Sequence, residues 1–190
     1  MTAGDIYNIA GGHRGFSGDG GPATSAELYH PDGVTVDAAG NLVIADAGNN
    51  RIRVIAESTG TFYGVPMTAG DIYTVAGGGD SGLGDGGPAT SAKLDHPDDV
   101  AVDAAGNLVI ADTYYDRIQV VAQSTGTFYG RPMTAGDIYP VAGDGIGGFS
   151  GDGGPATSAE LFDPTGIALN PAGGLFIADW FNNRIREVSP

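Results

Sequence analysis

The sequence predicts an all-β protein assembled from repeated four-stranded antiparallel sheets, and three observations lead to this expectation. The heptapeptide MTAGDIY begins at Met1, at Met67 and again at Met133, so that successive copies lie 66 residues apart. Each copy contains short runs of β-forming residues separated by turns rich in Gly and Asn. The 34 glycines recur in register from copy to copy, which indicates turns and not disorder. Repeats of this length are supersecondary units that stack on their neighbours.

The repeats span residues 1–66, 67–132 and 133–190 and are expected to form a single array. In the first copy, strands are expected at residues 34–37, 42–46 and 51–55, with a fourth at 71–77. The segment Leu42-Val43-Ile44 is apolar on both faces, which is typical of a strand buried within stacked sheets. Short strands joined by Gly/Asn turns favour an antiparallel meander.

The link between units is the segment GDGGPATSAEL, which begins at Gly18. Pro22 suits the first position of a short helix, and the residues after it can form one or two turns. We expect the leucines that end this link to fill the gap between sheets, namely Leu28, Leu94 and Leu161. The GDGG stretch lacks the Gly-Lys-Ser/Thr of a phosphate-binding loop, so we interpret it as a structural turn.

A four-stranded meander repeated radially is the blade of a β-propeller. The segments FSGDGGPATSAEL and PDGVTVDAAGNLVIADAGNNRIRVI resemble the NHL repeat family of β-propellers, and similar segments recur in the second and third copies. This resemblance covers nearly the whole chain. It implies a funnel-shaped propeller, usually of six blades, but it does not fix a function. Residues 57–66 and 123–132 lengthen the link between third and fourth strands, and we expect them to form hairpins at the rim of the blades.

Three blades are too few to close around an axis, because closed propellers have four to eight. The chain begins with an isolated fourth strand at residues 5–10 and ends with a third strand at residues 184–188. We therefore expect these pieces to pair between two chains, which gives a six-bladed homodimer closed by strand exchange. The residues assigned to this closure are Asp5, Ile6, Tyr7, Ile9, Arg184, Ile185, Arg186 and Val188. We favour a three-repeat piece of an amplified, truncated or engineered array over the alternative of a complete natural gene.

The composition excludes several classes of partner. The formal net charge is −15 and the isoelectric point about 4.1, so the chain should bind neither nucleic acid nor an anionic membrane. The sequence has no cysteine, and none of its apolar runs approaches the roughly 20 residues of a membrane span. The chain start lacks the basic and apolar regions of a signal peptide. These features predict a soluble acidic protein of undetermined compartment.

Candidate metal ligands are few. The zinc lyases of related fold, the peptidyl-hydroxyglycine amidating lyases, carry histidines just after the proline that opens the inner strand. Asp32, Asp98 and Thr165 occupy those positions here, so the zinc ligands are not carried over. Asp32 and Asp98 could still ring the channel of a dimer and hold an adventitious Ca²⁺, or they could be simple turn residues. We interpret the three histidines, His13, His30 and His96, as loop residues and expect no cofactor.

Two further patterns recur. Asp46, Asp112 and Asp179 each precede an arginine by five residues (Arg51, Arg117 and Arg184), which predicts a structural clamp across the turn. Aromatic pairs recur on the expected rim hairpins and in the turns between second and third strands: Phe62, Tyr63, Phe128, Tyr129, Tyr114, Tyr115, Trp180 and Phe181. Exposed aromatics could bind a protein or a glycan, whereas buried ones would pack between neighbouring blades.

These observations favour a non-catalytic propeller protein that self-assembles and acts by protein binding. The alternative is a propeller enzyme, lyase- or hydrolase-like, with a metal or polar site in the central channel.

Overall fold

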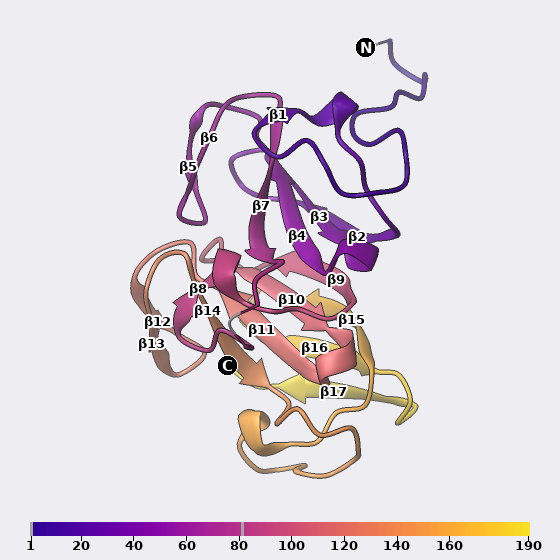
Figure 1. The fold of residues 1–190 in the computed structure, drawn as a ribbon. Helices are drawn as coiled ribbons and strands as arrows, with labels where there is room; N and C mark the ends of the chain where they lie inside the picture. Colours follow the sequence, from indigo (N-terminus) through magenta and orange to yellow (C-terminus); the bar gives the residue numbers. More distant parts are fainter. Residues whose placement is uncertain (1, 81) are drawn as a thin grey trace.

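The computed structural model describes residues 2–80 and 82–190 (Figure 1). Three large antiparallel sheets follow one another along the chain. Sheets 1 and 2 each take their last strand from the start of the next sequence repeat. Sheet 1 has the order β1-β7-β4-β3-β2, with β1 at Gly21–Pro22, β2 at Pro31–Val36, β3 at Leu42–Asp46, β4 at Arg51–Ile55 and β7 at Asp71–Gly77. Sheet 2 has the order β8-β14-β11-β10-β9, with β8 at Gly87–Pro88, β9 at Pro97–Val102, β10 at Leu108–Asp112, β11 at Arg117–Val121 and β14 at Asp137–Ala142.

Sheet 3 contains three strands among the described residues, β15 at Pro164–Leu169, β16 at Leu175–Asp179 and β17 at Arg184–Val188. The strands expected at 42–46, 51–55 and 71–77 are confirmed. The first strand begins earlier than expected, at Pro31, because an irregularity between Pro31 and Val34 lets its start pair with Asp46. The isolated strand expected at residues 5–10 is not formed within the single chain, where this segment has no ladder partner.

The longer links do form hairpins. β5 (Gly60–Phe62) pairs with β6 (Val65–Met67), and β12 (Gly126–Phe128) pairs with β13 (Arg131–Met133). The helical turns are single 3₁₀ turns: η1 at Ala23–Ser25, η2 at Ala47–Asn49, η3 at Ala89–Ser91, η4 at Thr113–Tyr115 and η5 at Ala156–Ser158. Pro22 lies at the N-cap of η1 and not at its first position, because its ψ of 126° is extended.

The core lies between the sheets, not within one of them. Val43, Val54 and Leu94 of the first interface pack with Val100 and Leu108 of sheet 2. The second interface is built the same way, with Leu161 in the place of Leu94. Leu94 and Leu161 are each 1% exposed, as expected for gap-filling side chains. Leu28 is half-buried against sheet 1.

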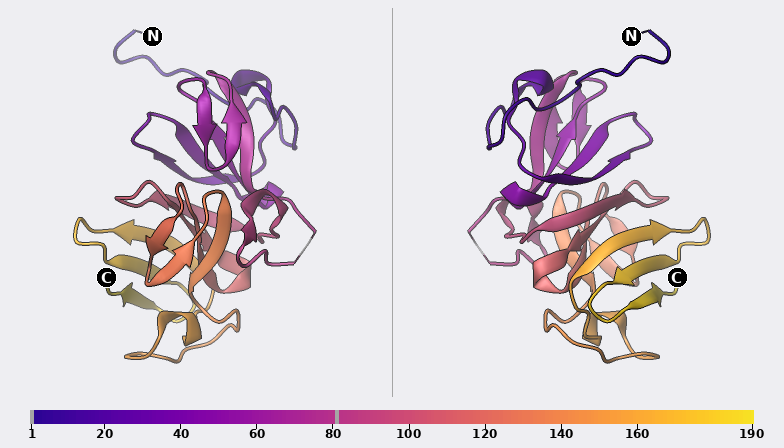
Figure 2. Two further views of the ribbon diagram at one scale, coloured as in Figure 1. Left: turned by 90° about the vertical axis from the view of Figure 1, so that its left-hand side faces the viewer. Right: turned by 90° about the vertical axis from the view of Figure 1, so that its right-hand side faces the viewer.

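The stacking places the first strands of the sheets side by side, with β9 between β2 and β15 (Figures 1 and 2). Among the described residues, the helices are all too short and insufficiently apolar to cross a membrane.

Candidate functional sites

A buried aspartate ends β3, β10 and β16, one strand in each sheet. It anchors the loop that leads into the neighbouring strand, which is β2, β9 or β15. Asp46, Asp112 and Asp179 are each 0% exposed. Each accepts a hydrogen bond of 2.8 Å from a backbone N–H 17 residues earlier, at Tyr29, Asp95 and Phe162 respectively. The sequence pattern had indicated a clamp at these aspartates, but not this backbone partner.

The arginine of the clamp differs from the expected one. The guanidinium of Arg53, not of Arg51, lies 3.5 Å from the Asp46 carboxylate. Arg51 instead stacks on the Phe16 ring, at 3.9 Å from its centroid. Arg184 likewise stacks on a phenylalanine. The guanidinium of Arg186 lies 3.3 Å from the Asp179 carboxylate. In sheets 1 and 3 the expected pairs were wrong because the link that folds back over the sheet supplies an aromatic ring that engages the first arginine. In sheet 2 the first arginine, Arg117, instead pairs with Asp85 of the link at 3.2 Å.

Sheet 2 lacks this arginine. Gln119 stands where Arg53 and Arg186 stand, and its Nε2 donates to Asp112 at 2.6 Å. Gln119 Oε1 is buried without a hydrogen-bond partner among the described residues. Burial away from water raises the pKa of Asp112 to about 7, with hydrogen bonds from Asp95 and Gln119 opposing the rise.

The channel candidates Asp32 and Asp98 come together across the joint between sheets 1 and 2. One carboxylate oxygen from each, together with a ring nitrogen of His96, lies within 4.8 Å of the others. His96 Nδ1 is 2.7 Å from Asp98 Oδ1, and its ring stacks on Tyr114 at 4.8 Å. The prediction that His96 is only a loop histidine missed this neighbourhood. No strand periodicity could have indicated it, because His96 lies just before β9 with a left-handed φ of 51°.

Acidic groups crowd the same end of the joints. The pKa of Asp163 is raised by partial burial and by the negative charges of Asp116 and Asp98. The pKa of Asp99 is raised by burial, although backbone N–H groups of Ile167 and Val100 oppose the shift. Such a negative field favours cations and disfavours phosphate ligands.

The hairpin aromatics are largely covered. Tyr63 is 2% exposed, and its hydroxyl donates to Asp37 at 2.9 Å. Phe62 packs on the first core, while Phe128 and Tyr129 pack on the second. These rings therefore tie the hairpins to the sheets, as in the packing alternative, and leave little surface for a ligand.

The turn aromatics are more exposed. Tyr114 is 55%, Trp180 58% and Phe181 51% exposed, whereas Tyr115 is half-buried beside Lys93. Phe181 contacts both Trp180 and Phe162, with ring centroids 4.6 and 4.8 Å apart. This aromatic cluster is the largest exposed one that the structure places at a turn between second and third strands.

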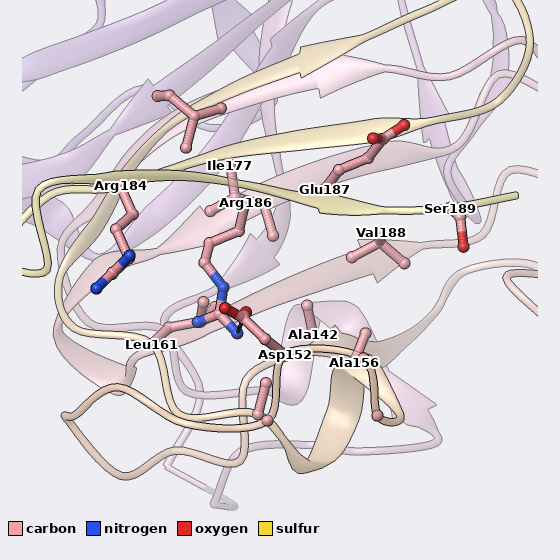
Figure 3. A pocket seen from close by; sticks show the side chains of 15 residues that line it. Ala142, Asp152, Ala156, Leu161, Ile177, Arg184, Arg186, Glu187, Val188 and Ser189 are labelled. Carbon is pink, nitrogen blue, oxygen red and sulfur yellow. Dashed lines mark ion pairs between the residues drawn. The ribbon is translucent and has the colours of Figure 1, made fainter.

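The residues assigned to closure lie at opposite ends of the molecule. Ile6 is 99%, Tyr7 42% and Ile9 50% exposed. Ile185 of β17 is 73% exposed, and the free edge of β17 borders a cavity of about 700 Å³ (Figure 3).

Stacked antiparallel sheets with their first strands side by side define a β-propeller-type fold. A putative phosphatase of Bacteroides thetaiotaomicron superposes with a TM-score of 0.61 at 12% identity, over 88% of this chain and 36% of that chain. An auxiliary nutrient binding protein of the same organism gives 0.58 at 18% identity, over 81% and 36%. At such identities the likeness concerns the fold alone.

Residues 28–55 match the NHL repeat, so the chain contains an NHL repeat. Human teneurin-1 is 31% identical over 159 residues, which are 78% of this chain but 5% of teneurin-1. The protein SUPPRESSOR OF QUENCHING 1, chloroplastic, of Arabidopsis thaliana is 28% identical over 188 residues, or 96% of this chain and 16% of that protein. The chain thus spans a small part of these relatives.

Proposed function

We propose that the chain is a non-catalytic NHL propeller unit, two copies of which close into a six-bladed homodimer that serves as a protein-binding platform. One observation carries this proposal. Residues at equivalent repeat positions are buried where two sheets of the chain meet and exposed on the first and last sheets. Val100 packs against sheet 1 and is 2% exposed, whereas its counterpart Val34 is 62% exposed. Val36, on the same strand, is 59% exposed. An apolar sheet face of this kind favours a further sheet as its cover.

The opposite end is bare at matching positions too. Ala47 and Thr113 are 0% and 2% exposed, whereas Trp180, at the same repeat position, is 58% exposed. The Thr113 hydroxyl donates to Pro164 O of the next sheet at 2.8 Å, which shows how that sheet covers this position. Trp180 therefore lies at the joint that a fourth sheet would complete.

A recurring hydrogen bond across the joints gives the register of the two copies. Asn50 accepts from His96 N at 2.8 Å across the first joint, and Asp116 accepts from Asp163 N at 2.8 Å across the second. Asn183 and His30 hold the corresponding positions at the two ends. A twofold axis that brings Asn183 of one copy to His30 of the other satisfies both ends in both copies.

Light scattering on a sizing column tests the assembly. We expect twice the chain mass of 19.1 kDa across a dilution series. Trp180 is the sole tryptophan, so its emission should shift to the blue in the dimer and to the red in dilute denaturant as the joint opens. A monomer at all concentrations, with emission typical of an exposed indole, would refute the proposal.

The binding role rests on the exposed aromatics that closure leaves uncovered. Tyr114 stacks on His96 at the mouth of a joint and remains 55% exposed. Tyrosine contributes a large rigid contact area, which suits a protein or glycan ligand. Binding of the intact protein and of Tyr114→Ala to immobilised glycans tests the glycan alternative. Equal signals from both proteins would show that Tyr114 does not contribute to glycan binding.

The alternative of a propeller enzyme is favoured by one observation, the Asp32–His96–Asp98 cluster. Two carboxylates and an imidazole suit a divalent cation that accepts mixed oxygen and nitrogen ligands. Mn²⁺ titration followed by electron paramagnetic resonance tests it, with Asp98→Asn as the matched variant. One tight Mn²⁺ per chain that Asp98→Asn abolishes would favour the enzyme, whereas weak binding by both proteins would disfavour it.

A further inference from the structure

The free edge of β17 borders a cavity at the position where the other two sheets have a fourth strand. The cavity of about 700 Å³ lies between Arg184–Ser189 on one side and the loop Gly151–Gly154 on the other, with Leu161 and Ile177 among its lining residues. Figure 3 shows the side chains of Arg184, Arg186 and Asp152 at one end of it and that of Val188 at the other.

The equivalent space is filled in the other two sheets. In sheet 1, β7 lies between β4 and the short strand β1 and pairs with both. In sheet 2, β14 lies between β11 and β8 in the same way. Ile72 and Ile138, the second residues of β7 and β14, are each 0% exposed. The filled space thus buries an isoleucine completely.

Residues 5–11 have the sequence that fills this space elsewhere. They read DIYNIAG, against DIYTVAG in β7 and a DIYPVAG segment that begins with β14. Within the single chain Ile6 is 99% exposed, and the segment forms no ladder. The apolar positions that are buried in β7 and β14 therefore face solvent here.

The link that follows this segment already has the geometry of a link that leaves a fourth strand. Gly143, at the end of the sheet 2 segment, donates its N–H to Ala156 O in the link that leads to sheet 3. Gly11 donates its N–H to Ala23 O in the same manner. Gly11 and Gly143 both have positive φ, 73° and 82°, which glycine adopts without strain. Residues 5–10 thus occupy the place of a fourth strand belonging to the sheet that precedes sheet 1.

The segment cannot reach the cavity of its own chain. It extends from the sheet 1 end of the molecule, whereas β17 and its cavity lie at the sheet 3 end, with sheet 2 between them (Figures 1 and 2). Within the described residues the segment and the cavity therefore lie apart, and a second copy can bring them together.

We infer that residues 5–11 of one copy enter the cavity beside β17 of the other as its fourth strand. This inference rests on the proposed homodimer and specifies how it is held closed. The pairs Ile55–Ile72, Val54–Tyr73 and Arg51–Gly77 of sheet 1 set the register. Ile6 then pairs with Val188, Tyr7 with Glu187 and Gly11 with Arg184 of the other copy.

One polar contact adds specificity to this register. In sheet 1 the Thr74 hydroxyl donates to Asp19 at 2.6 Å, while Arg53 holds the same carboxylate at 2.7 Å. Asn8 has the position of Thr74, and Asp152 is already held by Arg186 at 2.8 Å. The side-chain amide of Asn8 in the inserted segment can therefore donate a hydrogen bond to the Asp152 carboxylate of the other copy. The acceptor is preformed, so the inserted segment supplies main-chain pairing and two isoleucines, Ile6 and Ile9, as in β-strand addition. Their counterparts in sheet 1, Ile72 and Val75, are each 0% exposed.

A deletion with peptide complementation tests the inference. The variant that lacks residues 1–10 should lose the dimer at concentrations where the intact chain keeps it. A synthetic peptide of residues 2–11 should bind this variant with one peptide per chain in calorimetry, and it should not bind the intact dimer. A peptide carrying Ile6→Asp should bind at least about tenfold more weakly, since burial of the isoleucine is lost.

Two point variants of the intact chain separate this site from general surface effects. Ile6→Asp should dissociate the dimer, whereas Ile146→Asp should not, although Ile146 is also 61% exposed and lies outside the cavity lining. Equal effects of the two substitutions would overturn the inference.

Engineered cysteines test the register, because the chain has none of its own. Mixed Tyr7→Cys and Glu187→Cys chains should form a disulfide-linked dimer on oxidation. Mixed Tyr7→Cys and Arg184→Cys chains should not, since three residues along a strand separate the sites by about 10 Å.

The outcomes distinguish this inference from the proposed function. An intact dimer that survives the deletion unchanged, together with no peptide binding, overturns strand donation and leaves the homodimer. A monomeric intact chain overturns the homodimer, while peptide binding to the deletion variant would still support the cavity as a strand acceptor. Absence of both the dimer and peptide binding overturns both the homodimer and strand donation.

Discussion

Replacing Gln119 by arginine should make the protein more stable at neutral and alkaline pH. Asp112 is fully buried, and the group opposite it is a neutral amide instead of a guanidinium. In sheets 1 and 3 the equivalent aspartates face Arg53 and Arg186. The new arginine would find two similar acceptors, since Asp85 and the Lys93 carbonyl hold the repeat positions of Asp19 and Glu27 O, which Arg53 contacts. It would share Asp85 with Arg117, which already pairs with that carboxylate at 3.2 Å.

The magnitude follows from the pKa of Asp112. Its folded value of about 7 exceeds the ordinary value of 3.8, so the folded protein binds this proton more tightly than the unfolded chain. The stabilisation linked to this proton is fully present below about pH 4 and is lost as the pH rises through 7. The difference between the folded and ordinary pKa values corresponds to about 4 kcal/mol above pH 7. If the arginine recovers half of it, about 2 kcal/mol, the melting temperature at pH 8 should rise by about 4–8 °C.

Urea unfolding at pH 5 and pH 8 provides the assay. The variant should gain stability mainly at pH 8, and its stability should fall less between the two pH values than that of the parent. Asp112→Asn, which cannot titrate, should flatten the same dependence. The reciprocal substitution Arg53→Gln should destabilise at pH 8, because it leaves Asp46 buried without its cation. An arginine variant that is less stable than the parent at pH 8 would refute the reasoning.

Two further predictions concern packing and a buried hydrogen bond. Gly77→Ala should destabilise the protein by at least about 2 kcal/mol more than Gly70→Ala in urea titrations. Both glycines have φ above 80°, but only a Cβ at Gly77 collides with Asn50 O. Equal losses of stability would contradict this. Tyr63→Phe should lower stability by about 1–2 kcal/mol, since its hydroxyl donates to Asp37 in a covered hairpin; an unchanged unfolding midpoint would show that this bond contributes nothing.

The repeat could be interpreted from the sequence because its signals are local. Glycine positions, turn residues and alternating strands recur in every copy, and they fixed the strands at 42–46, 51–55 and 71–77. The same recurrence indicated the hairpins and the gap-filling leucines. The single first-strand error came from the irregularity after Pro31, which depends on pairing with the neighbouring strand.

The partners of charged and aromatic side chains could not be predicted in this way. The sequence placed Asp46 near Arg51, but a folded-back link brings Phe16 onto Arg51 and leaves the carboxylate to Arg53. It left Tyr63 as a possible binding residue, although the hairpin turns that ring inward.

The sequence by itself determined the repeating all-β unit, the matching segments at the two ends and the acidic character that disfavours nucleic acid. Tertiary structure alone decided that His96 meets Asp32 across a joint, that Asp112 is buried beside a neutral amide and that a cavity borders the edge of β17. The physical reason is distance along the chain. Backbone conformation depends on neighbours in sequence, whereas charge pairing and burial depend on residues farther along the chain. Arg53 meets Asp19 when the link folds back over the sheet, and Asp32 meets His96 only when the sheets stack.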